Sequence, residues 1–218
     1  MFKKTLLASA VLAASTGVAL ANGGSYTPPK PQSAYNVYVG AGVSRDAFNY
    51  EEPIAKGYKD DKGGKGWNGD LFAGVGYTFQ HRYYIAGEIF GSLSNAKLAY
   101  YDKNAAGKFY KEELQAKHSY GISLIPGVKL SDSTMMYGRV GLNQTKFECK
   151  EKGTSESKNK SGLQLGLGVQ TMVANNVSLR MEYDWNHFGD IKAKGIKADN
   201  LTTNQVKLQV AYHFKNLI

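Results

Sequence analysis

Histidine, cysteine and serine are the side chains of this chain that could carry out nucleophilic or metal chemistry. Cys149 is the single cysteine, and four histidines are scattered along the chain: His81, His118, His187 and His213. A metal site needs several such ligands at short spacing, and a hydrolase needs a serine that faces a histidine. Ser119 is expected on the opposite strand face from His118, and residues 186–190, the most site-like stretch, have no nucleophile beside them. The sequence therefore predicts no catalytic residue, cofactor or metal site.

Charged residues offer a second kind of chemistry, because eight of them occur on one face of alternating segments. They are four acids and four bases: Asp70, Glu88, Glu182, Asp184, Lys129, Arg139, Arg180 and Lys207. Unpaired charges in a narrow, dry interior are costly, so the equal numbers predict salt-bridged networks across that interior. If the last hairpin pairs Asp184 with Lys207, both point inward at one level. The network is then a plug that stabilises the wall, with a gate or narrow conductance as the alternative.

Strands must position these charges, because eight segments alternate with a period of two. They cover about residues 34–44, 67–79, 83–94, 120–130, 136–143, 163–173, 177–186 and 204–214. In the last segment Val206, Leu208 and Val210 share one face, and Lys207 and Gln209 share the other. Pro126 lacks the N–H group that a strand ladder uses, so we expect a β-bulge beside it.

The second face of these segments distinguishes a membrane barrel from a soluble one. It carries mainly Gly, Ser, Asn and Gln, whereas the outer face of a soluble barrel would be densely charged. Small side chains suit the narrow lumen of an eight-stranded barrel. Aromatic residues also gather near the segment ends, as they do in the girdles of membrane barrels. The sequence therefore predicts an all-β fold: an eight-stranded antiparallel up-and-down transmembrane β-barrel.

The connections between segments alternate in length. Residues 80–82, 131–134 and 175–176 predict tight turns, and residues 45–66, 99–117, 146–160 and 188–201 predict long, lysine-rich loops. Bacterial barrels place short turns in the periplasm and long loops outside, so both chain ends should be periplasmic. Four lysines form a candidate anion-binding loop: Lys150, Lys152, Lys158 and Lys160. Lipopolysaccharide or an acidic host or neighbouring cell surface would be the partner, and a solvated loop without a partner is the alternative.

The ends of the chain predict export. Residues 1–21 have the basic start, apolar run and small-residue cleavage site of a signal peptide. Residues 22–33 are expected to form a flexible periplasmic tail, residues 34–214 the barrel, and residues 215–218 a short C-terminal tail. The apolar run is shorter than the roughly 20 residues of a membrane-spanning helix. We therefore expect the protein in the bacterial outer membrane, where nucleic acid is an implausible partner.

Several segments resemble the small outer-membrane β-barrels of the OmpA transmembrane-domain and opacity-protein type. The resemblance rests on residues 37–42, 137–141, 179–183 and 210–214 and covers about residues 34–214. It implies a plug built from Glu88 with Arg139 or Arg180, and recognition of the last strand by the barrel-assembly machinery. In that family the closing aromatic is usually the last residue, whereas residues 215–218 follow Phe214 here.

The resemblance is strong for fold and weak for function, because these motifs build a barrel wall rather than a site. We expect a non-enzymatic structural or surface-interaction protein, adhesin-like, with long basic extracellular loops. A narrow porin-like channel is the first alternative. A lipid-modifying outer-membrane enzyme is the less favoured one.

Overall fold

The computed structural model describes residues 35–55, 58–95, 97–103, 109–151, 154–193 and 196–214. Its side chains are described for residues 35–47, 65–95, 115–148, 157–189 and 201–214. The expected signal peptide and both expected tails, residues 1–21, 22–33 and 215–218, lie outside the described residues.

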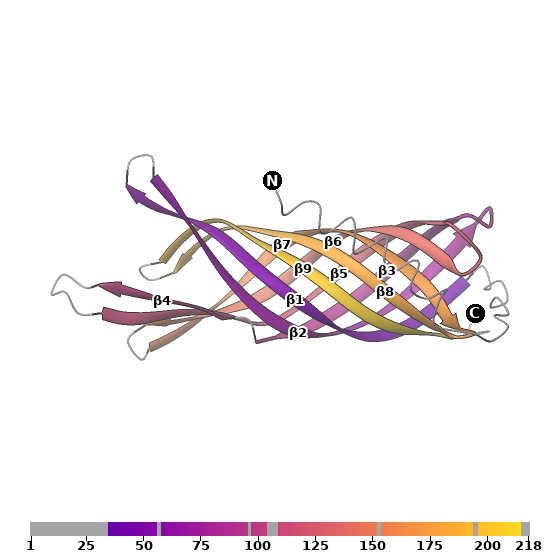
Figure 1. Ribbon diagram of the computed structural model, residues 1–218, viewed down its shortest axis with the longest axis horizontal. Coiled ribbons are helices and arrows are strands. Elements are labelled where there is room, and N and C mark those ends of the chain that lie inside the picture. Colours follow the sequence, from indigo (N-terminus) through magenta and orange to yellow (C-terminus); the bar gives the residue numbers. More distant parts are fainter. Residues whose placement is uncertain are drawn as a thin grey trace, which may run out of the picture.

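The described chain folds as one closed antiparallel barrel (Figure 1). Its strands are β1 (Tyr35–Ala55), β2 (Tyr58–Phe79), β3 (Tyr83–Ser94), β4 (Lys97–Lys103), β5 (Phe109–Lys129), β6 (Thr134–Glu151), β7 (Thr154–Ala174), β8 (Val177–Ala193) and β9 (Ile196–Phe214). β3 and β4 pair in turn with the same strand, β5, so together they make one wall position. β1 pairs with both β2 and β9, which closes the sheet. The predicted eight-stranded antiparallel barrel is therefore confirmed.

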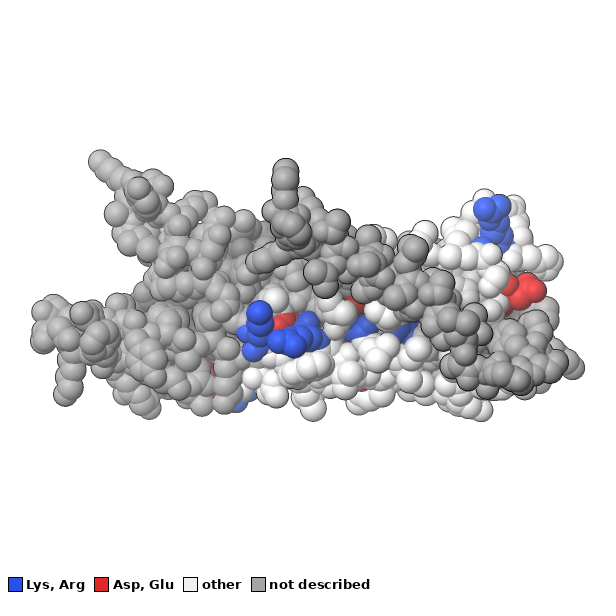
Figure 2. All heavy atoms as spheres, in the orientation of Figure 1, with Lys and Arg blue, Asp and Glu red and all other residues white. Residues whose placement is uncertain are grey.

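The strands alternate between two environments that are reversed relative to a water-soluble barrel. Large apolar side chains cover the outside: Leu71 is 67% exposed, Leu93 73% and Leu167 71%. Polar and charged side chains fill the inside, where Arg180 and Asp184 have no exposed surface. Figure 2 shows a mostly uncharged wall, and its largest basic group lies nearest the β1–β2 and β4–β5 hairpins. An apolar exterior with a polar interior is the pattern of a lipid-embedded barrel.

Aromatic rings mark the two ends of this apolar wall. At the end with tight turns, Tyr35 lies 4.8 Å from Tyr77 between ring centroids, and Phe79 stacks on Tyr83 at 5.5 Å. Trp67 lies near the middle of β2, at the other end of the apolar wall, and the Arg45 guanidinium sits 5.5 Å from its ring. Aromatic rings at both membrane–water interfaces are typical of transmembrane β-barrels.

The predicted tight turns are confirmed, but the predicted long loops are wrong over most of their length. The β1–β2 ladder continues to the pair Ala55 and Tyr58, so most of residues 45–66 is paired strand. A span needs about 9–11 residues, whereas β1 has 21 and β2 has 22. In Figure 1 the β1–β2 and β4–β5 hairpins extend past the closed barrel, away from the end where β9 stops. Strand ladders begun in the membrane continue into water because each further pair satisfies its own backbone groups.

The bulge expected at Pro126 is also absent from the described β5. Pro126 pairs with Ile85 of β3, and the β5–β6 register is the same on both sides of it. The register shift lies instead between Ala116 and His118. A proline removes one ladder donor, but its ring faces outward here, so the strand passes it without an inserted residue.

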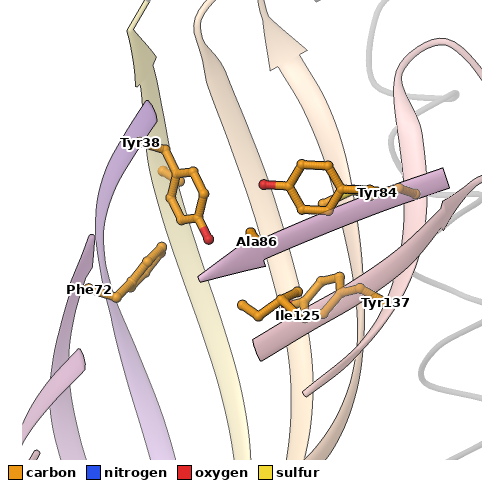
Figure 3. Close-up of a cluster of buried hydrophobic side chains, with 8 residues drawn as sticks. Tyr38, Phe72, Tyr84, Ala86, Ile125 and Tyr137 are labelled. Carbon is orange, nitrogen blue, oxygen red and sulfur yellow. The ribbon is translucent and has the colours of Figure 1, made fainter. Parts of the chain in front are cut away.

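Aromatic side chains pack the inside of the barrel at the turn-proximal half (Figure 3). Tyr38 from β1 and Tyr84 from β3 project toward the same space, beside Ile125. The Tyr38 ring lies over Gly74, its cross-strand partner, and any Cβ at Gly74 would collide with that ring. The small residues of the inner face therefore leave room for the large side chains of neighbouring strands.

Candidate functional site in the barrel lumen

Glu88 of β3 is the centre of a buried ion-pair network. Its Oε1 accepts a hydrogen bond from Arg139 Nη2 at 2.6 Å. Its Oε2 accepts one from Arg180 Nη1 at 2.8 Å and one from the Tyr38 hydroxyl at 3.0 Å. The resemblance implied Arg139 or Arg180 as the partner, and the structure brings both to Glu88. One carboxylate thus joins β1, β3, β6 and β8 across the lumen.

A second carboxylate, Glu182 of β8, continues the network toward β9. Arg139 Nη2 donates to Glu182 Oε2 at 3.1 Å, and Arg139 Nε lies 2.9 Å from Oε1. Lys207 Nζ lies 3.7 Å from Glu182 Oε1 and 2.7 Å from Asp184 Oδ2. Three acids and three bases therefore form one connected group, and every member is buried.

The expected pairing of Asp184 with Lys207 at one level of the last hairpin is wrong. The Cα partner of Lys207 on β8 is Glu182, and the partner of Asp184 is Gln205. Lys207 reaches Asp184 diagonally, because cross-strand neighbours two residues apart on one face are still within reach of a long side chain. The register of the β8–β9 hairpin determines which residues pair. The alternation within each strand does not fix that register.

Aromatic rings and amides surround the Arg180 guanidinium. Its Cζ lies 4.8 Å from the ring centroids of Tyr38 and Phe72 and 5.4 Å from that of Tyr137. Its Nε donates to Gln170 Oε1 at 2.6 Å. A guanidinium is weakly hydrated and stacks on aromatic faces, so this cage offsets part of its desolvation.

Hydroxyl and amide groups complete the network on β5 and β7. Ser123 Oγ accepts from Arg139 Nη1 at 3.0 Å, and Gln164 Nε2 donates to Asp184 Oδ2 at 2.8 Å. These hydrogen bonds connect β5 and β7 to the strands that carry the ion pairs. The arrangement holds buried charges in place.

Two of the eight expected lumen charges lie outside this network. Among the described residues, Asp70 is buried but takes no part in these ion pairs, and half-buried Lys129 also takes none. One lumen charge was missed: Asp46 of β1 is buried on the inner face, opposite Gln205 of β9. Asp46 and Tyr38 are an even number of residues apart on β1, so they face the same side of the strand. Extending the predicted strand past residue 44 would therefore have placed Asp46 inside.

The candidate anion-binding lysines are not gathered on an exposed loop. Lys158 and Lys160 belong to β7, are half-buried, and pair with the buried Phe147 and Thr145 of β6. Cross-strand partners point to one face of a sheet, so both lysines lie on the lumen-facing side of the wall. The Lys150 side chain and the whole of residue 152 lie outside the described part.

One serine and one histidine are in contact inside the lumen near the tight turns: His213 Nε2 lies 2.7 Å from Ser178 Oγ, and its Nδ1 lies 2.9 Å from Asn36 Oδ1. All three side chains are buried. His118 and His187 have other surroundings. Ser119 Oγ bonds Thr145 Oγ1 at 2.7 Å inside the lumen, whereas His118 is exposed. His187 stacks on Trp185, with ring centroids 5.6 Å apart. No group of three or more His, Cys, Asp or Glu residues in the described part of the chain is placed to hold a metal ion.

Comparison with known proteins decides the family. The model of the outer membrane protein beta-barrel domain matches residues 5–214. The chain belongs to this family. The expected resemblance to small outer-membrane barrels is confirmed, and the protein is an outer-membrane β-barrel. A search of curated proteins finds no match.

Solved structures of this outer-membrane barrel type share its fold. Neisserial surface protein A is 18% identical, with a TM-score of 0.54 over 84% of this chain and 98% of that one. Ail, the attachment invasion locus protein of Yersinia pestis, is 18% identical, with a TM-score of 0.51 over 84% of this chain and 100% of that one. A second Ail structure, in complex with the heparin analogue sucrose octasulfate, has a TM-score of 0.50, the same identity and the same coverage.

Proposed function

We propose that this outer-membrane barrel is a closed, non-enzymatic wall protein whose extracellular hairpins attach to anionic glycan or glycolipid surfaces. The observation that carries the proposal is the length of the strands. β1, β2, β5 and β7 each have 21 or 22 residues, about ten more than a membrane span needs. Paired strands form a stiffer platform than open loops, and a stiff platform lowers the entropy cost of binding.

Charge supports an anionic partner. The whole chain has a formal net charge of +9, with 27 basic and 18 acidic residues. The buried charges of the described lumen are five acids and three bases, so the basic excess lies elsewhere. Lys158 and Lys160 lie on β7 toward the β6–β7 hairpin, with their side chains on the lumen-facing side and only half-buried. The Ail structure with a heparin analogue has a ligand of the same polyanionic class.

The lumen network supports a closed barrel rather than a porin-like channel. Glu88, Arg139, Arg180 and Glu182 lie across the lumen with at most 3% of their surface exposed. An eight-stranded barrel is just wide enough for side chains to fill. We therefore infer that the ion pairs plug the lumen and that activity, where the protein has one, is carried by the hairpins outside.

Binding to a polyanion tests this proposal. Refolded barrels carrying Lys150→Glu, Lys152→Glu, Lys158→Glu and Lys160→Glu should lose binding to lipopolysaccharide vesicles and to immobilised heparin. Binding by the unmodified protein should weaken between low and physiological salt, since screening acts on exposed charges. A variant with Arg82→Glu and Lys129→Glu, at the periplasmic end, should bind normally. Its charge-matched comparison is the double variant Lys150→Glu, Lys152→Glu, because each pair of changes lowers the net charge by the same amount. Equal binding by the unmodified protein and the lysine variant would overturn the proposal.

A further inference from the structure

The lipid-facing wall differs between two arcs of the barrel. On the arc formed by β1, β2, β3, β5 and β6, some outward-facing residues are small, and an added Cβ at Gly69 or Gly87 would meet open space. On the opposite arc, residues 163–173, 177–187 and 204–214 of β7, β8 and β9 include no outward-facing glycine. We call the first arc the β1–β6 arc, and it is the one that leaves room outside the wall.

A trough crosses the β1–β6 arc and continues to β7. It has a volume of about 740 Å³, and its outward-facing lining includes Ala73, Ile89, Ile122 and Leu142. These four are successive cross-strand partners, so the trough runs across the strands, and Gly87 deepens it. An acyl chain that lies in such a trough contacts more atoms than one on a smooth wall, and each contact adds a small dispersion attraction.

Basic side chains lie at one end of the apolar wall on β1 and β2. Tyr35 and Tyr77 pair near the tight turns, and ten residues away along both strands Arg45 pairs with Trp67. About 9–11 residues of a strand cross a bilayer, so Arg45 and Trp67 lie at the other membrane interface, on the side of the long hairpins. Both are exposed, and exposed Lys65 follows on the same face of β2.

The same spacing places basic side chains on β5 and β6. Val128 pairs with Met136 near the tight turns, and ten residues away His118 pairs with Lys146. His118 is exposed and Lys146 is half-buried. Each shares the outward face of its strand with a trough residue four positions away, which is about 13 Å along a strand. An acyl chain can therefore extend from a head group at this level into the trough.

The opposite arc has no arginine or lysine at this level in the described part of the chain. There β7, β8 and β9 carry Leu163, His187 and Asn204. On β6, the outward-facing acid next to Lys146 is Glu148, which is already paired with Lys117 at 3.0 Å. Room for acyl chains and positive charge at the interface therefore coincide on one side of the barrel.

We propose that the β1–β6 arc binds a phosphorylated glycolipid of its own membrane, with phosphates at Arg45 and Lys146 and acyl chains in the trough. Arginine and lysine side chains at an interface bind phosphate through charge and hydrogen bonds. The strands that carry Lys65 and His118 lie on either side of β3, two strand spacings or about 10 Å apart. A head group with two phosphates, such as the bisphosphorylated disaccharide of lipid A, can reach both basic groups, whereas a phospholipid brings one phosphate.

This site is separate from attachment by the hairpins. A facing surface, or a glycan without acyl chains, meets the hairpins, whereas only a lipid of the surrounding bilayer can enter the trough. The lipid-binding proposal and the attachment proposal can therefore fail independently.

Lipid binding by the intact, refolded barrel tests the site. The protein is refolded in a zwitterionic detergent free of lipopolysaccharide, and bound lipid is counted by native mass spectrometry during titration. Bisphosphorylated lipid A should bind saturably, and dephosphorylated lipid A and phosphatidylglycerol should each bind at least tenfold more weakly. In the Arg45→Gln, Lys146→Gln double variant the affinity for lipid A should fall at least tenfold. Gly87→Leu fills the trough where an added Cβ meets open space, so it should lower the affinity at least threefold at an unchanged unfolding temperature.

The matched control is Arg82→Gln, Lys129→Gln, which removes the same positive charge at the tight-turn end and should bind lipid A normally. The Arg45→Gln, Lys146→Gln variant should keep heparin binding, because its hairpins are unchanged. Equal lipid A affinity of this variant and the unmodified protein would overturn the site. Equal binding of phosphatidylglycerol and lipid A would overturn the assignment to a bisphosphorylated glycolipid, and an unchanged affinity in Gly87→Leu would overturn the role of the trough.

Discussion

Replacement of Glu88 tests whether the ion-pair network holds the lumen together. Glu88 accepts three hydrogen bonds, two of them from guanidinium groups, and has 3% of its surface exposed. Glu88→Gln keeps the shape of the side chain but leaves the ion-pair network, which has three acids and three bases, with one positive charge in excess. Removing one partner of a buried pair typically destabilises by about 3–5 kcal/mol.

The surroundings place the expected loss at the lower end of that range. Arg139 keeps Glu182 as a partner, and Arg180 keeps its aromatic cage and Gln170. We therefore expect Glu88→Gln to reduce the free energy of unfolding by about 3 kcal/mol, roughly a hundredfold in the equilibrium. The charge-balanced double variant Glu88→Gln, Arg180→Met should recover part of this loss, because Met fills an apolar space and leaves no excess charge.

Reversible urea unfolding in lipid vesicles measures these changes. Glu148→Gln is the matched control, because Glu148 also pairs with a base, Lys117 at 3.0 Å, but on a partly exposed surface. An exposed pair of this kind contributes about 0–1 kcal/mol. Planar-bilayer recording of the Glu88→Ala variant should show conductance that the unmodified protein lacks. A Glu88→Gln variant no less stable than Glu148→Gln, together with an open unmodified barrel, would refute the plug.

Three further changes test the faces, the close contacts and the extensions. Leu165→Arg places a charge on the lipid-facing wall and should destabilise by about 2–4 kcal/mol in vesicle unfolding; stability equal to that of the unmodified protein would contradict the face assignment. Gly74→Ala should cost about 1–3 kcal/mol because the new Cβ meets the Tyr38 ring, whereas Gly87→Ala, whose Cβ meets open space, should be nearly neutral in the same assay. Deleting residues 49–63 should leave a barrel with an unchanged urea midpoint, since these residues lie on the extension; loss of folding would show that the extension helps to hold the wall.

The sequence predicts the membrane part of this fold well for a physical reason. Within the bilayer each strand separates lipid from a polar interior, so the side chains must alternate. That alternation places Glu88, Arg139 and Arg180 on one face without any knowledge of the neighbours. It also places the tight turns, because a turn ends the alternation abruptly.

The strand extensions and the cross-strand register depend on interactions that leave no alternating pattern in the sequence. Beyond the membrane both faces of a strand meet water, so residues 45–66 resemble a loop although most of them are paired. Asp46 was missed for this reason. The partner of Lys207 depends on the hairpin register, and the faces of Lys158 and Lys160 depend on how far the β6–β7 ladder continues.

The seam between β1 and β9 determines when the protein can become a barrel. Across it, Asn36 Oδ1 lies 2.9 Å from His213 Nδ1, although 177 residues separate the two in the chain. During synthesis β1 is made first and must wait for the last strand with its edge unpaired. An open strand edge is a template for aggregation. Until β9 has been made and pairs with it, this edge of β1 therefore stays open to pairing with other strands.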